Sequence, residues 1–208
     1  MPLDLWLTFV AASTALLLIP GPTILLVLSY ALSQGRRVAV ASATGVALGD
    51  LVAMSASLAG LGALVLASAT LFTILKWVGA IYLIYLGIKL LRSAPSSDLE
   101  TLTPNEKPAR GVFWRAAAVT ALNPKSIAFF IAFVPQFVSV KQPLLPQFTI
   151  LIATFVGLAA INALAYALLA DKLRQTIGRG SVITMLTRGG GVALIGMGVM
   201  TATLRRSA

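Results

Sequence analysis

Residues 5–32 read LWLTFVAASTALLLIPGPTILLVLSYAL and contain no charged side chain. A helix needs about 20 apolar residues to cross the hydrocarbon core of a bilayer, so this stretch is long enough to span a membrane. Pro20, Gly21 and Pro22 interrupt it past its midpoint. A secretory signal begins with basic residues, whereas the first Lys or Arg here is Arg36, so we expect the segment to be retained as a membrane span.

The composition of the whole chain is also typical of a membrane protein. Of its 208 residues, 58% are hydrophobic and 11% are charged, against about 25% charged in a typical soluble domain. The mean hydropathy is +0.94. Cysteine and histidine are absent, which excludes disulfides, thiol nucleophiles, imidazole bases and the usual zinc ligands, and no cofactor is expected. The net charge of +10 sits between apolar stretches, so the expected partner is a lipid bilayer rather than nucleic acid.

Six apolar stretches predict an all-α polytopic membrane protein with six transmembrane helices. They lie near Leu5 to Leu32, Val38 to Leu64, Leu71 to Leu91, Val112 to Val138, Pro146 to Ala170 and Met185 to Leu204. The join between the second and third spans is short and apolar, which leaves open five spans and one re-entrant piece. The polar residues 93–110 form a linker, so we divide one transmembrane domain into units 1–92 and 111–208.

Basic residues indicate the orientation, because cytoplasmic loops retain Lys and Arg. The face that carries the first, third and fifth loops holds eleven of them: Arg36, Arg37, Lys89, Arg92, Lys107, Arg110, Arg115, Lys172, Arg174, Arg179 and Arg188. The opposite face holds four: Lys76, Lys141, Arg205 and Arg206. We therefore expect the linker to be cytoplasmic and both termini to be on the non-cytoplasmic side.

The two units resemble each other in sequence. A shift of 102 residues pairs Pro22 with Pro124. A shift of 112 pairs Gly45, Ala47, Asp50 and Ala53 with Gly157, Ala159, Asn162 and Ala165, and a shift of 111 pairs Gly79, Leu83, Ile84 and Gly87 with Gly190, Leu194, Ile195 and Gly198. A unit of three spans enters the membrane inverted in its second copy, as in many secondary transporters. We predict two inverted three-helix repeats whose first helices, the first and fourth of the chain, are interrupted by proline.

The interrupted helices are the predicted site. Proline removes a backbone donor and frees a carbonyl, which in lipid requires a partner from protein or water. The segments 20–22 and 123–125 (Asn123, Pro124 and Lys125) should therefore open their helices at mid-depth. A simple kink packed against a neighbouring helix is the alternative for each proline. Two matched interruptions favour a paired binding site.

Charged and polar groups near these breaks indicate the ligand. Asp50 lies well inside the second span, where an ionisable residue is costly and therefore a functional candidate. It is the one carboxylate expected at mid-membrane depth, so it is the proton carrier if transport is proton-coupled. The alternative is a structural carboxylate that Lys125 neutralises.

Lys125 and the helix N-termini after Pro22 and Pro124 favour an anion such as a carboxylate. Asp50, with Thr44 and Asn162, could meet an ammonium group on the opposite side. Together these groups predict a site for an amino acid. Asn162 alone could equally form an interhelical hydrogen bond.

Small residues on the third and sixth spans predict close helix packing, and they permit a homodimer. These are Gly79, Gly87, Gly190, Gly191 and Gly198.

Several motifs in order resemble the LysE/RhtB family of amino-acid exporters. They are Pro20-Gly21-Pro22, Gly45 to Asp50, the run KWVGAIYLIYLG at residues 76–87, and Asn123-Pro124-Lys125 followed by Pro135-Gln136-Phe137. The resemblance covers nearly the whole chain and is weakest over residues 93–110 and 172–188. It implies a bacterial cytoplasmic-membrane exporter of amino acids such as threonine, homoserine or leucine, driven by proton antiport.

The predicted function is therefore secondary active export by alternating access, in which no bond is made or broken. A membrane enzyme would need clustered ionisable groups, which these spans do not offer. A channel or an accessory membrane subunit is the other alternative, and saturable counterflow would distinguish an exporter from a channel.

Overall fold

The computed structural model describes residues 1–19, 21–67, 69–92, 108–139, 142–170 and 180–203. All regular secondary structure in these ranges is helical, which confirms the predicted all-α class. The helices are α1 (Leu3–Leu18), α2 (Pro22–Ala67), α3 (Ala69–Arg92), α4 (Ala109–Ala121), α5 (Pro124–Ala132), the 3-10 helix η1 (Val134–Phe137), α6 (Leu144–Leu168) and α8 (Gly180–Thr203).

Two of the helix breaks fall where proline predicts them. α1 ends at Leu18 and α2 begins at Pro22, with a bend of 59° between the two helices. α4 ends at Ala121 and α5 begins at Pro124, with a bend of 44°. Proline cannot donate to the preceding turn but fits at the first position of a new helix, so each proline starts a helix rather than continuing one. The side chain of Asn123 caps α5 by accepting a hydrogen bond from the backbone N–H of Lys125 at 3.1 Å.

Within the described residues, two helical segments are long and apolar enough to cross a membrane, Arg37–Gly60 and Leu144–Leu168. The number rises to four if each bent pair, α1 with the start of α2 and α4 with α5 and η1, counts as one span. α3 and α8 contribute the shorter apolar segments Trp77–Lys89 and Gly191–Thr203.

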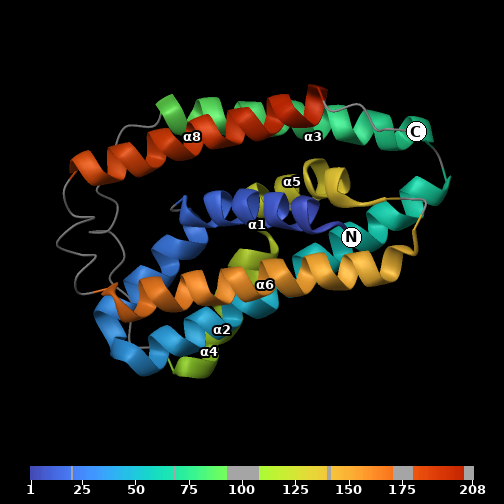
Figure 1. Ribbon diagram of the computed structural model, residues 1–208. Coiled ribbons are helices and arrows are strands. Elements are labelled where there is room, and N and C mark those ends of the chain that lie inside the picture. Colours follow the sequence, from blue (N-terminus) through green and yellow to red (C-terminus); the bar gives the residue numbers. More distant parts are fainter. Residues whose placement is uncertain (20, 68, 93–107, 140–141, 171–179, 204–208) are drawn as a thin grey trace.

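One predicted boundary needs correction. The first and second spans were expected as separate helices, but α2 is assigned as one helix through the basic residues 36 and 37. The segments Pro22–Ala31 and Arg37–Gly60 nevertheless belong to different candidate spans, and α2 changes direction between them (Figure 1).

The helices form three layers (Figure 1). α3 and α8 lie side by side on one side, α1 and α5 lie in the middle, and α2, α4 and α6 form the other side. Phenylalanine rings from α1, α5, η1 and α6 form a core, and each ring is at most 1% exposed. Phe9, Phe129, Phe130, Phe133, Phe137 and Phe155 form it, with ring centroids 4.8 to 6.5 Å apart in the contacting pairs. Aromatic pairs at these distances pack favourably beyond their buried area.

The contact between α3 and α8 is reciprocal. A Cβ placed on Gly87 would lie 2.6 Å from the carbonyl oxygen of Gly191 and 2.7 Å from Cγ1 of Ile195. A Cβ placed on Gly198 would lie 2.8 Å from the carbonyl oxygen of Ala80 and 2.6 Å from Cγ1 of Ile84. The two backbones therefore approach as closely as glycine allows, which confirms the close packing predicted for these positions.

Candidate functional site

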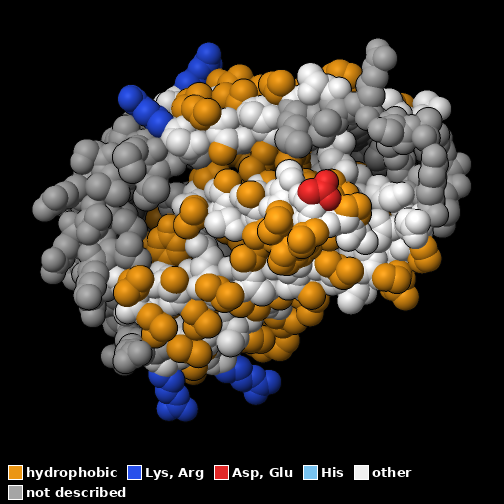
Figure 2. Space-filling model, in the orientation of Figure 1, with side chains coloured by type: hydrophobic (Ala, Val, Ile, Leu, Met, Phe, Trp, Pro, Cys, Tyr) orange, Lys and Arg blue, Asp and Glu red, His pale blue; other side chains and the backbone are white. Residues whose placement is uncertain are grey.

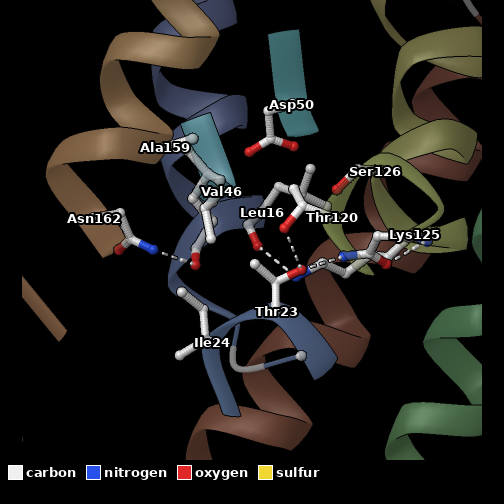
Figure 3. A pocket seen from close by; sticks show the side chains of 13 residues that line it. Leu16, Thr23, Ile24, Val46, Asp50, Thr120, Lys125, Ser126, Ala159 and Asn162 are labelled. Carbon is white, nitrogen blue, oxygen red and sulfur yellow. Dashed lines mark hydrogen bonds between the residues drawn. The ribbon is translucent and has the colours of Figure 1, made fainter. Parts of the chain in front are cut away.

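A pocket lies where the two interrupted helices meet (Figure 3). The volume open to the centre of a water-sized sphere is about 20 Å³, which is room for one or two water molecules and too little for an amino acid. Five helices and the two breaks contribute to its wall. The lining residues are Leu16, Leu17, Gly21, Thr23, Ile24, Val46, Asp50, Thr120, Asn123, Lys125, Ser126, Ala159 and Asn162.

Five of the nine residues predicted from the sequence line this pocket: Gly21, Asp50, Asn123, Lys125 and Asn162. Pro22 and Pro124 are exposed and do not line it, because each forms the first turn of its helix rather than the wall of the pocket. Pro20 lies outside the described residues.

Thr44 is the predicted site residue that the structure places elsewhere. Its side chain is exposed, and its hydroxyl donates to the carbonyls of Val40 and Ala41 in its own helix, at 3.1 and 3.0 Å. It occupies a different face of α2 from Asp50 and Val46, which face the pocket. Thr44 therefore does not line the pocket in this structure, and its predicted contribution to an ammonium site stays a prediction.

Lys125 contacts an unexpected partner. Its Nζ donates to the carbonyl oxygens of Leu16 at 3.1 Å and Ile19 at 2.9 Å. These carbonyls belong to the end of α1, where a helix has acceptors without intrahelical donors and carries partial negative charge. The ammonium group was expected to face an anion, but here it is bound by backbone carbonyls.

Two side chains of α6 complete the capping of α1. Asn162 donates from Nδ2 to the carbonyl of Leu17 at 3.1 Å, and the Tyr166 hydroxyl donates to the carbonyl of Leu18 at 3.3 Å. Four successive carbonyls at this end, residues 16–19, thus receive donors from α5 or α6. The break in the first helix is stable because the second half of the chain satisfies it.

Asp50 lines the pocket with a carboxyl group that is not fully hydrogen-bonded. Its side chain is 2% exposed, and Oδ1 has no hydrogen-bond partner among the described residues. Figure 3 shows its carboxyl group directed into the pocket. Lys125 is the cation that acts on it electrostatically. A buried carboxyl without a donor is costly when ionised, so this position favours a proton or a bound cation.

Three hydroxyl-bearing residues in the wall were not singled out from the sequence. Thr23 accepts hydrogen bonds at Oγ1 from Asn123 Nδ2 at 3.2 Å and from the Thr120 hydroxyl at 3.4 Å, which ties the start of α2 to the end of α4. Ser126 is also buried in the wall. Thr23 and Ser126 could have been predicted as site residues from the sequence, because they follow Pro22 and Lys125 at the two breaks.

A family of known proteins matches most of this chain. The model of the LysE type translocator family matches residues 14–205. This chain belongs to that family.

Individual relatives agree with the assignment. The chain is 35% identical over 207 residues to a homoserine/homoserine lactone efflux protein of Salmonella typhimurium, with 100% of both chains covered. It is 32% identical over 206 residues to an uncharacterized membrane protein of Vibrio cholerae, covering 99% of this chain and 100% of the relative. It is 31% identical over 168 residues to a leucine efflux protein of Salmonella choleraesuis, covering 81% of this chain and 79% of the relative. No solved structure matches the chain significantly.

Family membership confirms the predicted LysE resemblance, the membrane location and the assignment as a transporter rather than an enzyme. The matched region includes both helix breaks and every residue that lines the pocket.

Proposed function

We propose that this LysE family member exports amino acids or close derivatives, such as homoserine, homoserine lactone or leucine, across the bacterial cytoplasmic membrane in exchange for protons. The substrate class follows from the relatives, which are homoserine/homoserine lactone and leucine efflux proteins. The observation that carries the mechanism is the position of Asp50, a buried carboxyl that faces a pocket at two helix breaks and whose Oδ1 has no hydrogen-bond partner among the described residues. A proton on this carboxyl removes the cost of its burial, and its loss leaves a charge that can pair with a cation.

The pocket also supports alternating access. Its present volume of about 20 Å³ cannot hold an amino acid, so substrate enters only after the helices around the breaks move apart. The phenylalanine core joins α5 and η1 to α1 and α6, and it belongs to the same buried cluster as Leu16 and Ala159, which line the pocket. We take this core as a closed gate beside the pocket.

The proposed arrangement of the fold is two inverted three-helix repeats. The reciprocal α3–α8 contact supports it: under the shift of 111 residues, Ala80 and Gly87 become Gly191 and Gly198. Gly87 meets Gly191, and Gly198 meets Ala80. A two-fold axis between the helices produces such exchanged pairs. A six-span topology places α3 and α8 across the membrane beside the four candidate spans.

The distribution of charge supports the proposed orientation. Among the described side chains, the exposed basic residues Arg37, Lys89, Arg92, Arg110, Arg115 and Arg188 all belong to the face predicted to be cytoplasmic. Figure 2 shows the visible basic side chains in two groups, at the upper left and lower edges, and apolar side chains over much of the described surface, as expected for a protein surrounded by lipid.

Because the chain has no cysteine, this orientation can be tested with single cysteines and no background labelling. We expect Ser207→Cys in intact cells to react with a membrane-impermeant maleimide. Ser96→Cys in the linker should react only after the cells are opened. The reverse pattern would place the termini in the cytoplasm.

The test of function is efflux of radiolabelled leucine and homoserine from proteoliposomes under an imposed pH gradient. We expect the parent to accelerate efflux when the outside is acidic and to show saturable counterflow. Asp50→Asn should abolish the response to the pH gradient. Asp4→Asn is the matched control, because Asp4 is exposed in the first turn of α1 and does not line the pocket. Proton-coupled efflux at the parental rate in Asp50→Asn would show that another group carries the proton.

A further inference from the structure

The end of α1 inside the pocket binds a primary ammonium group within the protein itself. Lys125 Nζ makes two hydrogen bonds to carbonyls there, at 3.1 Å to Leu16 and 2.9 Å to Ile19. A lysine ammonium and the amino group of an amino acid are the same chemical group, with three N–H donors and one positive charge. The geometry that holds Lys125 therefore also fits the amino group of a substrate.

The surroundings of this ammonium are accessible from the pocket. Gly21 lies beside it, and even a Cβ at Gly21 would be 3.5 Å from Nζ, so the glycine leaves this flank uncovered. Leu16, Gly21 and Lys125 all line the pocket. A substrate in a widened pocket would therefore meet Nζ and its carbonyl acceptors directly.

A second group in the pocket also favours a cation. Asp50 is 2% exposed, its Oδ1 has no hydrogen-bond partner in the described part of the chain, and its carboxyl group points into the same space (Figure 3). The partially negative end of α1 and this carboxyl thus face one cavity. Lys125 is the one lysine or arginine among the residues that line it. The pocket could therefore accommodate a second position for this cation.

We propose that the carbonyls of Leu16 and Ile19 form the subsite for the substrate's ammonium group, and that Lys125 holds this subsite until a substrate amine displaces it. This inference rests on the proposed export function. The displaced Lys125 ammonium moves toward Asp50, whose carboxyl releases its proton and becomes the counter-ion. Substrate binding and proton release are thereby one exchange of partners. The recognised class is small primary amines, with or without a carboxylate, which includes both homoserine and its lactone.

The parent protein can test this with ligands that differ in one group. Calorimetric titration of the purified protein would use isoamylamine, which is leucine without its carboxylate, and isocaproate, which is leucine without its amino group. The third probe is isoamyltrimethylammonium, which keeps the charge but has no N–H donor. We expect isoamylamine alone to bind. Binding of isocaproate alone would make Lys125 an anion ligand and overturn the proposal, and equal binding of the two amines would show that carbonyl hydrogen bonds are not used.

Lys125→Met tests the competition. Removing the internal ammonium should tighten isoamylamine binding about tenfold or more, because the carbonyls then lack a donor. Lys89→Met is the matched control, since Lys89 is exposed in the last turn of α3. Unchanged or weaker binding in a folded Lys125→Met protein, judged by its thermal unfolding, would overturn the proposal. The parent titrations decide the matter if this variant does not fold.

Efflux measured on the same preparations separates the two proposals. Leucine or homoserine efflux without amine binding would leave the exporter function intact and reject the ammonium subsite. Selective amine binding without efflux of either amino acid would support the subsite and reject the proposed function.

Discussion

Adding one methyl group at Gly87 or at Gly198 should destabilise the protein by similar amounts. At Gly87 the new Cβ would lie 2.6 Å from the Gly191 carbonyl oxygen and 3.0 Å from the backbone nitrogen of Ile195. At Gly198 it would lie 2.8 Å from the Ala80 carbonyl oxygen and 3.2 Å from the nitrogen of Ile84. Because two of the three nearest atoms at each glycine are backbone atoms, they cannot rotate away as a side chain could.

The size of the effect follows from these distances. Ordinary carbon contacts lie at about 3.5 to 4.0 Å, so α3 and α8 must separate by roughly 0.5 to 1 Å. Overpacking of this kind costs about 1 to 3 kcal/mol. Alanine also gains about 1 kcal/mol of helix propensity over glycine, and a control must share this gain. Gly157→Ala on α6 is that control, because a Cβ there has no heavy atom within 4 Å among the contacts considered.

The assay is equilibrium unfolding in mixed micelles, followed by the fluorescence of Trp77 on α3 and the other tryptophans. We expect Gly87→Ala and Gly198→Ala each to be about 1 to 3 kcal/mol less stable than Gly157→Ala. The double variant should cost less than the sum, since one separation of the helices accommodates both methyl groups. A difference below about 0.5 kcal/mol from the control would refute the close approach. A loss of stability in only one of the two glycine variants would show that the contact between α3 and α8 is not reciprocal.

Three further variants test the core and the site. Phe129→Ala should cost about 3 to 5 kcal/mol in the same unfolding assay because it removes the ring that contacts four others, whereas Trp114→Ala, at an exposed position, should cost much less. Asn162→Leu should cost about 1 to 3 kcal/mol because the Leu17 carbonyl loses its donor, and stability equal to the parent would show that this bond contributes nothing. Thr44→Val should leave the rate of amino-acid efflux unchanged, and a large loss would return Thr44 to the transport machinery.

The helix breaks could be predicted because their cause is local. Pro22 and Pro124 each remove a backbone donor, and that effect needs no knowledge of neighbouring helices. Asp50 could be predicted for a similar reason, because a carboxyl within an apolar span is costly whatever surrounds it. The internal repeat, which pairs Pro22 with Pro124, was then enough to predict that these three residues lie at or beside one pocket.

The partner of Lys125 could not be predicted from residue types. Its acceptors are the backbone carbonyls of Leu16 and Ile19, more than a hundred positions away, and every residue carries the same carbonyl group. The position of Thr44 away from the pocket, however, could have been predicted from helix geometry. Six residues separate it from Asp50, and six residues of helix turn through about 600°, which places the two side chains roughly 120° apart around the axis.

Asp50 and Asn162 occupy matched positions in the two halves, and a proton on Asp50 decides whether both can donate a hydrogen bond to a helix end. Asn162 donates to the end of α1, and its amide can do so at any pH. Asp50 occupies the equivalent position in the first half, and its neighbour Gly49 packs against the Ala117 carbonyl and Thr120 near the end of α4. A carboxyl can donate to such an end only when protonated, whereas an ionised carboxylate is repelled by it. Protonation would therefore make the two halves alike and ionisation would make them differ. Asp50→Asn should imitate the protonated form permanently, so we expect it to lose both proton-driven efflux and substrate counterflow, because the displaced Lys125 ammonium then has no counter-ion. Counterflow at the parental rate in a stably folded variant would show that the charge of Asp50 is not needed for substrate binding.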